Sequence, residues 1–184
     1  FPVKRLAAIA ACILPMLANA HQDDAPGIYV EAGDTAFRDG DAGSYSAGAG
    51  VLLPWSAWGF AHGGQSLYWD LFAGNWSARN ETGGRSSFAQ IGAILTWRYR
   101  FSEGNSRWFA ELGLGGTLMD RTYHTPERQF STQFQFTELI GVGVSLGDRG
   151  QHEVGLRLQH FSNAGIKKPN PGETFVRARY TYRF

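Results

Sequence analysis

After residue 20, apolar residues alternate along the chain with polar or small residues. The clearest stretch alternates Ala89, Ile91, Ala93, Leu95, Trp97, Tyr99 and Phe101 against Gln90, Gly92, Thr96, Arg98 and Arg100, with Ile94 the single apolar exception. A period of two is typical of a β-strand, because successive side chains leave opposite faces. No segment after residue 20 has the sustained stripe of an amphipathic helix. The pattern predicts an all-β protein.

Eight such stretches follow one another, and most have ten residues or more. They cover residues 26–37, 44–55, 66–78, 87–101, 107–119, 133–147, 152–162 and 173–184. Strands of soluble sheets usually have about five or six residues, whereas a tilted membrane strand needs about nine to eleven. In lipid every backbone polar group must be paired, and only closure removes the sheet edges. We therefore expect an eight-stranded antiparallel transmembrane β-barrel, filled by its own side chains rather than open as a pore.

The connections and the last strand point to the bacterial outer membrane. Tight turns at 102–105 and 147–150 alternate with longer loops, as expected of short periplasmic turns and longer outer loops. The connection at 54–65 is long for a periplasmic turn. The chain ends on alternating aromatic residues, which resemble the signal by which outer-membrane barrels are recognised for assembly: Tyr180, Tyr182 and Phe184.

The first twenty residues are predicted to be a signal peptide, which leaves 21–184 as a single barrel domain. Lys4 and Arg5 form a basic region, an apolar stretch follows, and residues 18–20 read Ala-Asn-Ala, a small-x-small cleavage site. A transmembrane anchor is disfavoured because the apolar run is short and contains Pro15. The single cysteine, Cys12, lies in this segment, so we expect neither a disulfide nor a cysteine-ligated metal in the barrel.

Charge and composition exclude some function classes. The whole chain carries a formal charge of +1, and without Lys4 and Arg5 it has 15 basic against 16 acidic residues, or −1. A nucleic-acid binder should instead be basic. The mean hydropathy of −0.27 is that of a soluble protein, but a membrane barrel with a polar lumen gives a similar value. The sequence has no zinc-binding H-E-x-x-H, P-loop or cysteine pair, so none of these motifs indicates a metal or cofactor site.

A candidate reactive pair lies at the end of the stretch 152–162. Val154, Leu156 and Leu158 share its apolar face, and His160 and Ser162 continue that face. Side chains two positions apart on one strand face are neighbours, so the histidine could take the serine proton. With both termini periplasmic, the pair lies at the outer-leaflet end of the lipid-facing wall. The same two residues would also suit a polar girdle at the membrane boundary.

The residues around this pair carry a family resemblance. The run His160-Phe161-Ser162-Asn163-Ala164-Gly165-Ile166-Lys167-Lys168-Pro169-Asn170, followed by Gly172-Glu173, resembles the signature of the PagL family of outer-membrane lipid A 3-O-deacylases. The match covers about fourteen contiguous residues. The resemblance implies an eight-stranded barrel with a Ser-His-Glu triad on its outer surface. It also implies release of the 3-linked acyl chain of lipid A without a metal or cofactor.

The same resemblance implies residue roles. It makes Ser162 the nucleophile, His160 the general base and Glu173 the acid that orients the base. It places Asn163 and Gly165 beside the oxyanion, where backbone N–H groups could stabilise the tetrahedral intermediate. Asn170 belongs to the same motif, but the resemblance assigns it no definite role.

The orienting acid is the point at which this sequence departs from the family pattern. Strict alternation in 173–184 turns Glu173 inward, and the family's acid stands one position further along. A bulge, or a position before regular pairing, would turn it outward. A second carboxylate, Glu138, faces outward in 133–147. If the turn centres on Arg149, Glu138 opposes His160, so Glu138 is an alternative contact for His160 or for the substrate headgroup.

The sequence therefore predicts an outer-membrane esterase that removes the 3-O-linked acyl chain of lipid A. The expected partner is lipid A or lipopolysaccharide in the outer leaflet, not nucleic acid, and a homodimer is compatible with the sequence. The alternative is a non-catalytic small barrel with a structural or surface-binding role. A lipid A acyltransferase working inside a barrel would need His160 and Ser162 inward, and the aromatic C-terminal strand opposes a soluble lipocalin-like binder.

Overall fold

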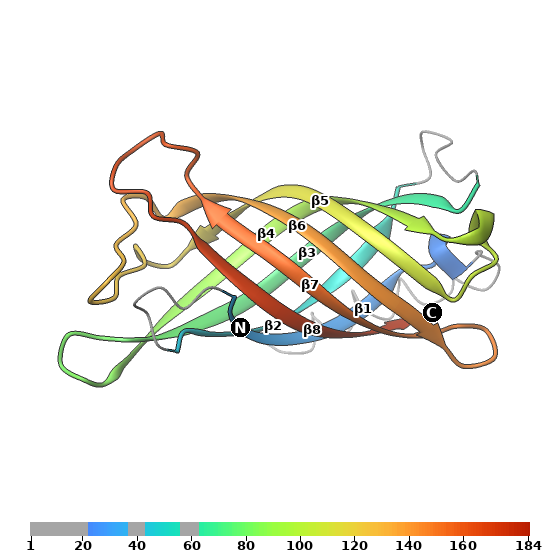
Figure 1. Cartoon of the computed structure of the whole chain (residues 1–184), viewed down its shortest axis with the longest axis horizontal. Coiled ribbons are helices and arrows are strands. Elements are labelled where there is room, and N and C mark those ends of the chain that lie inside the picture. The colour runs from blue at the N-terminus through green and yellow to red at the C-terminus, as the bar shows by residue number, and fades with distance from the viewer. Residues whose placement is uncertain (1–21, 37–42, 56–62) are drawn as a thin grey trace, which may run out of the picture.

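The computed structural model describes residues 22–36, 43–55 and 63–184, and it forms a closed antiparallel barrel (Figure 1). Each strand pairs with its neighbours along the chain, and β8 pairs back to β1. The strands are β1 (Gly27–Thr35), β2 (Tyr45–Pro54), β3 (Gln65–Arg79), β4 (Arg85–Arg100), β5 (Trp108–Met119), β6 (Phe134–Leu146), β7 (His152–Ser162) and β8 (Glu173–Arg183). The predicted fold is confirmed, and every expected strand end lies within two residues of the observed one.

Short 3-10 helices occur at one end of the barrel, which we call the turn end: η2 (Gln22–Asp24) and η4 (Ser102–Gly104). The opposite end, the loop end, carries the connections 80–84, 120–133 and 163–172 (Figure 1). The predicted signal peptide, and most of the long connection predicted at 54–65, lie outside the described residues. In the described ranges, no helix is long and apolar enough to cross a bilayer.

The apolar and polar positions that alternate along each strand lie on opposite faces of the barrel wall. In β7, Val154, Leu156 and Leu158 are exposed on the outside, whereas Arg157 and Gln159 are buried inside. Ile94, the apolar exception in β4, is 1% exposed and faces the lumen. An apolar outer face and a polar interior are what a barrel in lipid requires.

Ion pairs fill the middle of the lumen. Arg157 contacts the carboxylates of Asp70 at 2.8 Å and Glu111 at 2.6 Å, and Arg98 contacts Glu111 at 2.7 Å and Glu153 at 2.6 Å. All five side chains are at most 3% exposed. Buried charges are tolerated only when they are paired and hydrogen-bonded. The network therefore rigidifies the wall from inside.

Aromatic side chains close the lumen at the loop end. The cluster contains Trp76, Ala78, Phe88, Met119, Tyr123, Phe130, Phe161 and Phe175. Trp76 makes edge contacts with Tyr123 and Phe161, at centroid distances of 5.2 and 4.8 Å. Tyr123 and Phe130 come from the connection 120–133, so this loop is packed into the barrel end. It thereby forms a fixed support for the neighbouring loop at 163–172.

The register shows how rows of paired residues slope across the wall. Gly27 of β1 pairs directly with Arg183 of β8. A row is the series of directly paired residues on successive strands, and the row that starts at Gly27 and passes through β2 to β7 reaches β8 at Glu173. Glu173 is ten residues before Arg183, so the row does not close on itself. Its members between are Leu52, Asp70, Ile94, Gly115, Thr137 and Phe161. Such a shift means that the strands tilt by about 35–45° from the barrel axis. Since Glu173 is at the loop end, rows descend towards the turn end when followed from β8 back to β1.

Candidate active site

His160 and Ser162 lie at the loop end of β7, on the outer face of the barrel. Both are partly exposed, whereas Gln159 and Phe161 between and beside them are buried in the lumen. The placement follows from alternation alone, because the apolar face that ends at Leu158 continues through both residues. If the longer loops are extracellular, as in bacterial barrels, the pair lies at the level of the outer leaflet.

The imidazole is held by the neighbouring strand. His160 pairs with Thr174 across β7 and β8, and its Nδ1 lies 2.8 Å from Thr174 Oγ1. Ser162 Oγ accepts a long hydrogen bond, 3.5 Å, from the backbone N of Ala164. Within the described residues no hydrogen bond joins His160 to Ser162. In a resting enzyme catalytic hydrogen bonds are often long and close only with substrate bound.

Gly172 forms the surface against which the imidazole rests. It has φ +68°, and a Cβ built on it would lie 2.6 Å from His160 Cε1 and 3.0 Å from Nε2. A side chain at this position would therefore be strained by its backbone conformation and would collide with the ring. The glycine is required for both reasons.

Glu173 lies on the other side of the wall. It pairs with Phe161, is 2% exposed, and its Oε2 accepts a hydrogen bond of 3.2 Å from the Tyr123 hydroxyl. Regular pairing reaches this position, where β8 begins, so no bulge turns the carboxylate outward. The geometry does not support the predicted direct contact of Glu173 with His160, and the hydroxyl of Thr174 occupies that place instead.

Glu138 stands where the turn geometry predicts. It pairs with His160 across β6 and β7. The other pairs on this face, beginning with Val144 and Val154, also have the register that the turn predicts. The Glu138 side chain is exposed on the outer face. The described residues show no hydrogen bond between its carboxylate and His160. Directly opposed side chains have Cβ atoms about 5 Å apart, so a rotamer change would bring them together.

The loop after Ser162 is tied together by asparagine side chains. Asn163 N donates to Asn170 Oδ1 at 3.0 Å, and Gly165 N donates to Asn163 Oδ1 at 3.0 Å. Ala164 has φ +53° and Gly165 φ +78°. The backbone N–H groups predicted to bind the oxyanion are therefore bonded within the turn, and that of Ala164 is directed at Ser162.

The loop 120–133 supports this turn from the side. Asn163 Nδ2 donates to Ser131 Oγ at 3.0 Å and to Lys167 O at 2.7 Å, and Ser131 Oγ also donates to Lys167 O. Sequence reasoning missed this loop and Thr174. Thr174 could have been found by extending the pairing register across β7 and β8. The loop contacts join segments more than thirty residues apart and leave no periodic signal.

An open apolar groove lies on the outer wall, beside the pair. It has a volume of about 790 Å³ and crosses β3 to β6. Glycine and alanine form its floor, at Gly92, Ala93, Gly115 and Gly116, and apolar side chains form most of the remaining lining, with Leu71, Phe72, Ile91, Thr117, Leu118, Phe134 and Phe136. Phe136 is the cross-strand partner of Ser162, so the groove begins next to the serine.

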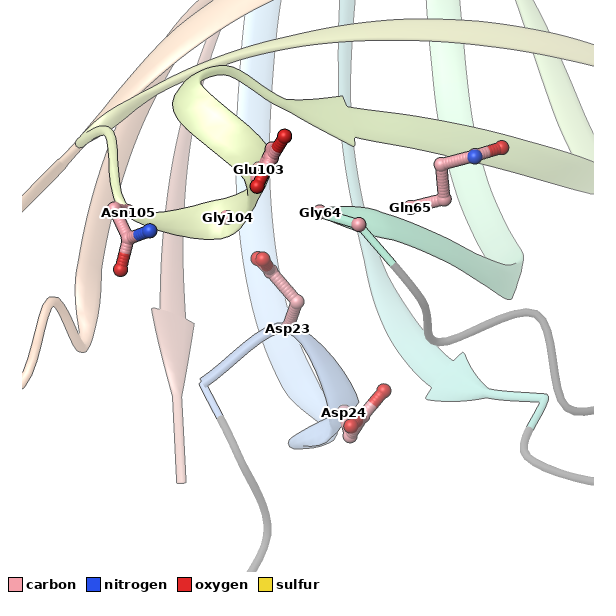
Figure 2. A pocket seen from close by; sticks show the side chains of 8 residues that line it. Asp23, Asp24, Gly64, Gln65, Glu103, Gly104 and Asn105 are labelled. Atoms are coloured by element: carbon pink, nitrogen blue, oxygen red, sulfur yellow. The ribbon is translucent and has the colours of Figure 1, made fainter.

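A second hollow, of about 330 Å³, lies at the turn end and is polar. Figure 2 shows Asp23 and Glu103 facing each other across it, between η2 and the β4–β5 turn. Burial by itself would raise the pKa of Asp23, but the hydrogen bond from Arg100 and the charge of Arg98 outweigh it and lower the pKa. The hollow is at the opposite end from Ser162. In the part of the chain that is described, no cluster of side chains suits a metal ion.

Comparisons with known proteins show the family of the chain. A family described as lipid A 3-O-deacylase (PagL) matches residues 43–183. The chain is similar to lipid A deacylase PagL of Bordetella bronchiseptica, with 36% identity over 132 residues, which cover 65% of this chain and 71% of that protein. It is also similar to lipid A deacylase PagL of Pseudomonas aeruginosa, with 28% identity over 174 residues, covering 92% and 93%.

Solved structures show the same barrel. A crystal structure of the outer membrane enzyme PagL superposes with a TM-score of 0.69 at 22% identity, covering 86% of this chain and 99% of that one. Neisserial surface protein A gives a TM-score of 0.53 at 13% identity, covering 86% and 97%. These likenesses concern the fold, whereas the family match spans most of the sequence. This chain therefore belongs to the lipid A 3-O-deacylase (PagL) family of outer-membrane β-barrel enzymes.

Proposed function

We propose that the chain hydrolyses the 3-O-linked acyl ester of lipid A at its outer wall, with Ser162 as nucleophile and His160 as general base. The observation that carries this proposal is the position of the pair, on adjacent outward positions of β7 and beside an apolar groove. Lipid A diffusing in the outer leaflet can bring its ester to this wall, so a deep pocket is not required. The reaction needs no metal or cofactor.

The chemistry is a two-step acyl transfer. Ser162 Oγ attacks the ester carbonyl carbon while His160 Nε2 takes its proton. The tetrahedral intermediate collapses, the 3-hydroxyl of lipid A leaves with the proton from His160, and the acyl chain stays on Ser162. Water then attacks the acyl-enzyme, His160 again takes the proton and returns it to Ser162 Oγ, and the free fatty acid departs.

Thr174 fixes the tautomer that this mechanism needs. For Nε2 to accept a proton, Nδ1 must carry one, and Thr174 Oγ1 at 2.8 Å is placed to accept that hydrogen bond. A hydroxyl holds the ring in place but compensates the positive imidazolium less than a carboxylate would. Glu138, directly opposite His160, is the carboxylate on the same face that can supply this charge.

The oxyanion is stabilised by the turn that follows the nucleophile. The backbone N of Ala164 lies 3.5 Å from Ser162 Oγ, so its N–H is a donor close to the reacting atom. Asn163, Asn170 and Gly165 hold this turn through their mutual hydrogen bonds. Rearrangement of these bonds on substrate binding would release the Asn163 and Gly165 N–H groups towards the developing charge.

The apolar groove is the site for the scissile acyl chain. Ser162 pairs with Phe136, Phe136 with Gly116, Gly116 with Ala93, and Ala93 with Leu71, so the serine and the groove lie on one row. Adjacent strands are about 4.8 Å apart, so the row is about 19 Å long. With a strand tilt of about 35–45°, it descends by about 12 Å from the outer end towards the membrane centre. An acyl chain following this row remains within the outer leaflet.

Filling the groove should reduce activity according to chain length. In Ala93→Phe, the new ring occupies the floor, so we expect kcat/KM for a long acyl ester to fall by about tenfold or more, and for a short ester to change little. Esters of increasing chain length in detergent micelles provide the measurement. The control is Ala32→Phe, on the lipid-facing side of β1. Equal losses for short and long esters would place the acyl chain elsewhere.

Three variants separate the contributions to His160. We expect Glu138→Gln to lower kcat by about 10- to 100-fold, because it removes the charge opposite His160. Thr174→Val should also lower kcat, because it removes the acceptor at Nδ1. Glu173→Gln should retain more activity than either, since its amide can still accept from Tyr123. Initial rates of deacylation in detergent test this order of activities. Full activity in Glu138→Gln would show that Glu138 does not stabilise the charge on His160.

Mass spectrometry of lipid A tests the function itself. In bacteria that lack such an enzyme, expression of this chain should convert lipid A to a species that lacks one acyl group at position 3. Unchanged lipid A with a folded, outer-membrane-located protein would favour the non-catalytic barrel. A homodimer stays a prediction, which light scattering of the purified protein in detergent would test.

A further inference from the structure

Arg128, in the loop 120–133, contacts the segment that precedes β8. Its guanidinium Nη1 donates to Gly172 O at 2.8 Å and lies 3.9 Å from Glu173 Oε1. The side chain is 18% exposed. Its backbone is fixed as well, because Arg128 N donates to Thr125 Oγ1 at 2.9 Å and Arg128 O accepts from Thr125 N at 2.7 Å. A long side chain is thus held in one place beside the site.

Both residues that Arg128 holds bear on the imidazole. Gly172 lies beside the Cε1–Nε2 edge of His160, so close that a Cβ at this position would be 2.6 Å from Cε1, and in the proposed mechanism this edge receives the serine proton. Glu173 is followed by Thr174, whose Oγ1 contacts Nδ1 at the opposite side of the ring. His160 is therefore confined between two neighbouring parts of one segment.

Glu173 ties this segment to the interior. Its Oε1 accepts from Thr174 N at 3.1 Å, and its Oε2 accepts from Tyr123, which belongs to the same loop as Arg128. Tyr123 is fully buried in the aromatic cluster at the loop end. The loop thus holds the start of β8 at Gly172 O from one side and at the Glu173 carboxylate from the other.

We propose that Arg128 is a positioning residue for His160, acting through Gly172 and the start of β8 and touching neither the imidazole nor the substrate. This inference rests on the proposed function of His160 and Ser162. It assigns the buried Glu173 a role as the inner anchor of the same clamp. Without Arg128, Gly172 O loses its donor, the start of β8 is released, and His160 loses the surface that aims Nε2 at Ser162.

The test compares Arg128→Met with Arg128→Lys and with Arg121→Met, whose side chain is 60% exposed in the same loop. Arg128→Met should lower kcat by about 100-fold, the cost of a misplaced catalytic group, with KM unchanged. Arg128→Lys should recover part of the loss, because an ammonium can still donate to Gly172 O. Arg121→Met should match the wild type. Rates are normalised to folded protein, measured by the gel shift of unheated samples.

Two further measurements make the outcome decisive. Gly172→Ala should reproduce the kcat loss of Arg128→Met, because it displaces the same ring edge. The rate at which a fluorophosphonate labels Ser162 should fall in Arg128→Met in proportion to kcat. Unchanged kcat in Arg128→Met, or a loss explained entirely by less folded protein, overturns the proposal. An active Ser162→Ala enzyme would instead overturn the proposed function, so the two failures are distinguishable.

Discussion

Ser162→Ala is expected to abolish deacylation, with kcat reduced by roughly 10³- to 10⁶-fold, the range found when a serine nucleophile is removed. In the proposed mechanism the Ser162 hydroxyl oxygen forms the acyl-enzyme, whereas the hydroxyl of Thr174 contacts the other ring nitrogen of His160, Nδ1. The rate of fatty-acid release from lipid A in detergent measures the effect. KM should change little, because alanine leaves the groove intact.

His160→Asn is the companion variant. An amide cannot take the serine proton, so its kcat should fall to a similar level, and the double variant should be little worse than either single one, because residues that act as a unit are not additive. A multiplicative loss in the double variant would contradict their joint role. The fold of each variant is checked by the gel shift of unheated samples.

Arg157→Met should destabilise the barrel by about 3–5 kcal/mol, the cost of removing one partner from a buried ion pair. Arg157 contacts Asp70, Glu111 and the Tyr68 hydroxyl, and methionine would leave both carboxylates without this cation in the lumen. Urea titration of the detergent-solubilised protein measures the free energy of unfolding. Activity of the fraction that remains folded should be retained, because the site is on the other face.

Arg149→Met is the matched control, since Arg149 is exposed in the β6–β7 turn. Its free energy of unfolding should stay within about 0.5 kcal/mol of the wild-type value. Equal stability of Arg157→Met and Arg149→Met would mean that the lumen network adds nothing to the stability of the barrel.

The fold could be predicted almost completely from the sequence. An alternation of period two has a single physical cause in this chain, a wall between lipid and a polar lumen, and it places strand ends within two residues. The same argument places His160 and Ser162 outside and pairs Glu138 with His160. Each of these conclusions needs only local periodicity and one turn.

The surroundings of the site could not be predicted in the same way. The role of Glu173 came only from the family pattern, whereas its inward position, now given by the pairing with Phe161, is the one that strict alternation predicts. The support from Arg128, Tyr123 and Ser131 depends on how an irregular loop packs over the barrel end. Such contacts join distant segments through side chains with no repeat, so only coordinates reveal them.

In the proposed mechanism the site works in lipid, and a shallow form suits that solvent. Substrate is concentrated in the same leaflet, and the diagonal row from Ser162 to Leu71 offers an acyl chain an apolar path along the wall. The rigid lumen holds that wall from inside. The loop 120–133 contacts the turn after Ser162 at the loop end, so the proposed site is supported both from the lumen and from this loop.

The most direct test of the central claim is peptide-level mass spectrometry after treatment with a long-chain fluorophosphonate. Attack by a serine hydroxyl on phosphorus displaces fluoride and leaves a stable adduct. We predict one adduct, on Ser162, formed in step with the loss of deacylase activity and formed much more slowly in His160→Asn. Inhibition with the adduct on a different residue, such as Ser131, would contradict the assignment of Ser162 as the nucleophile.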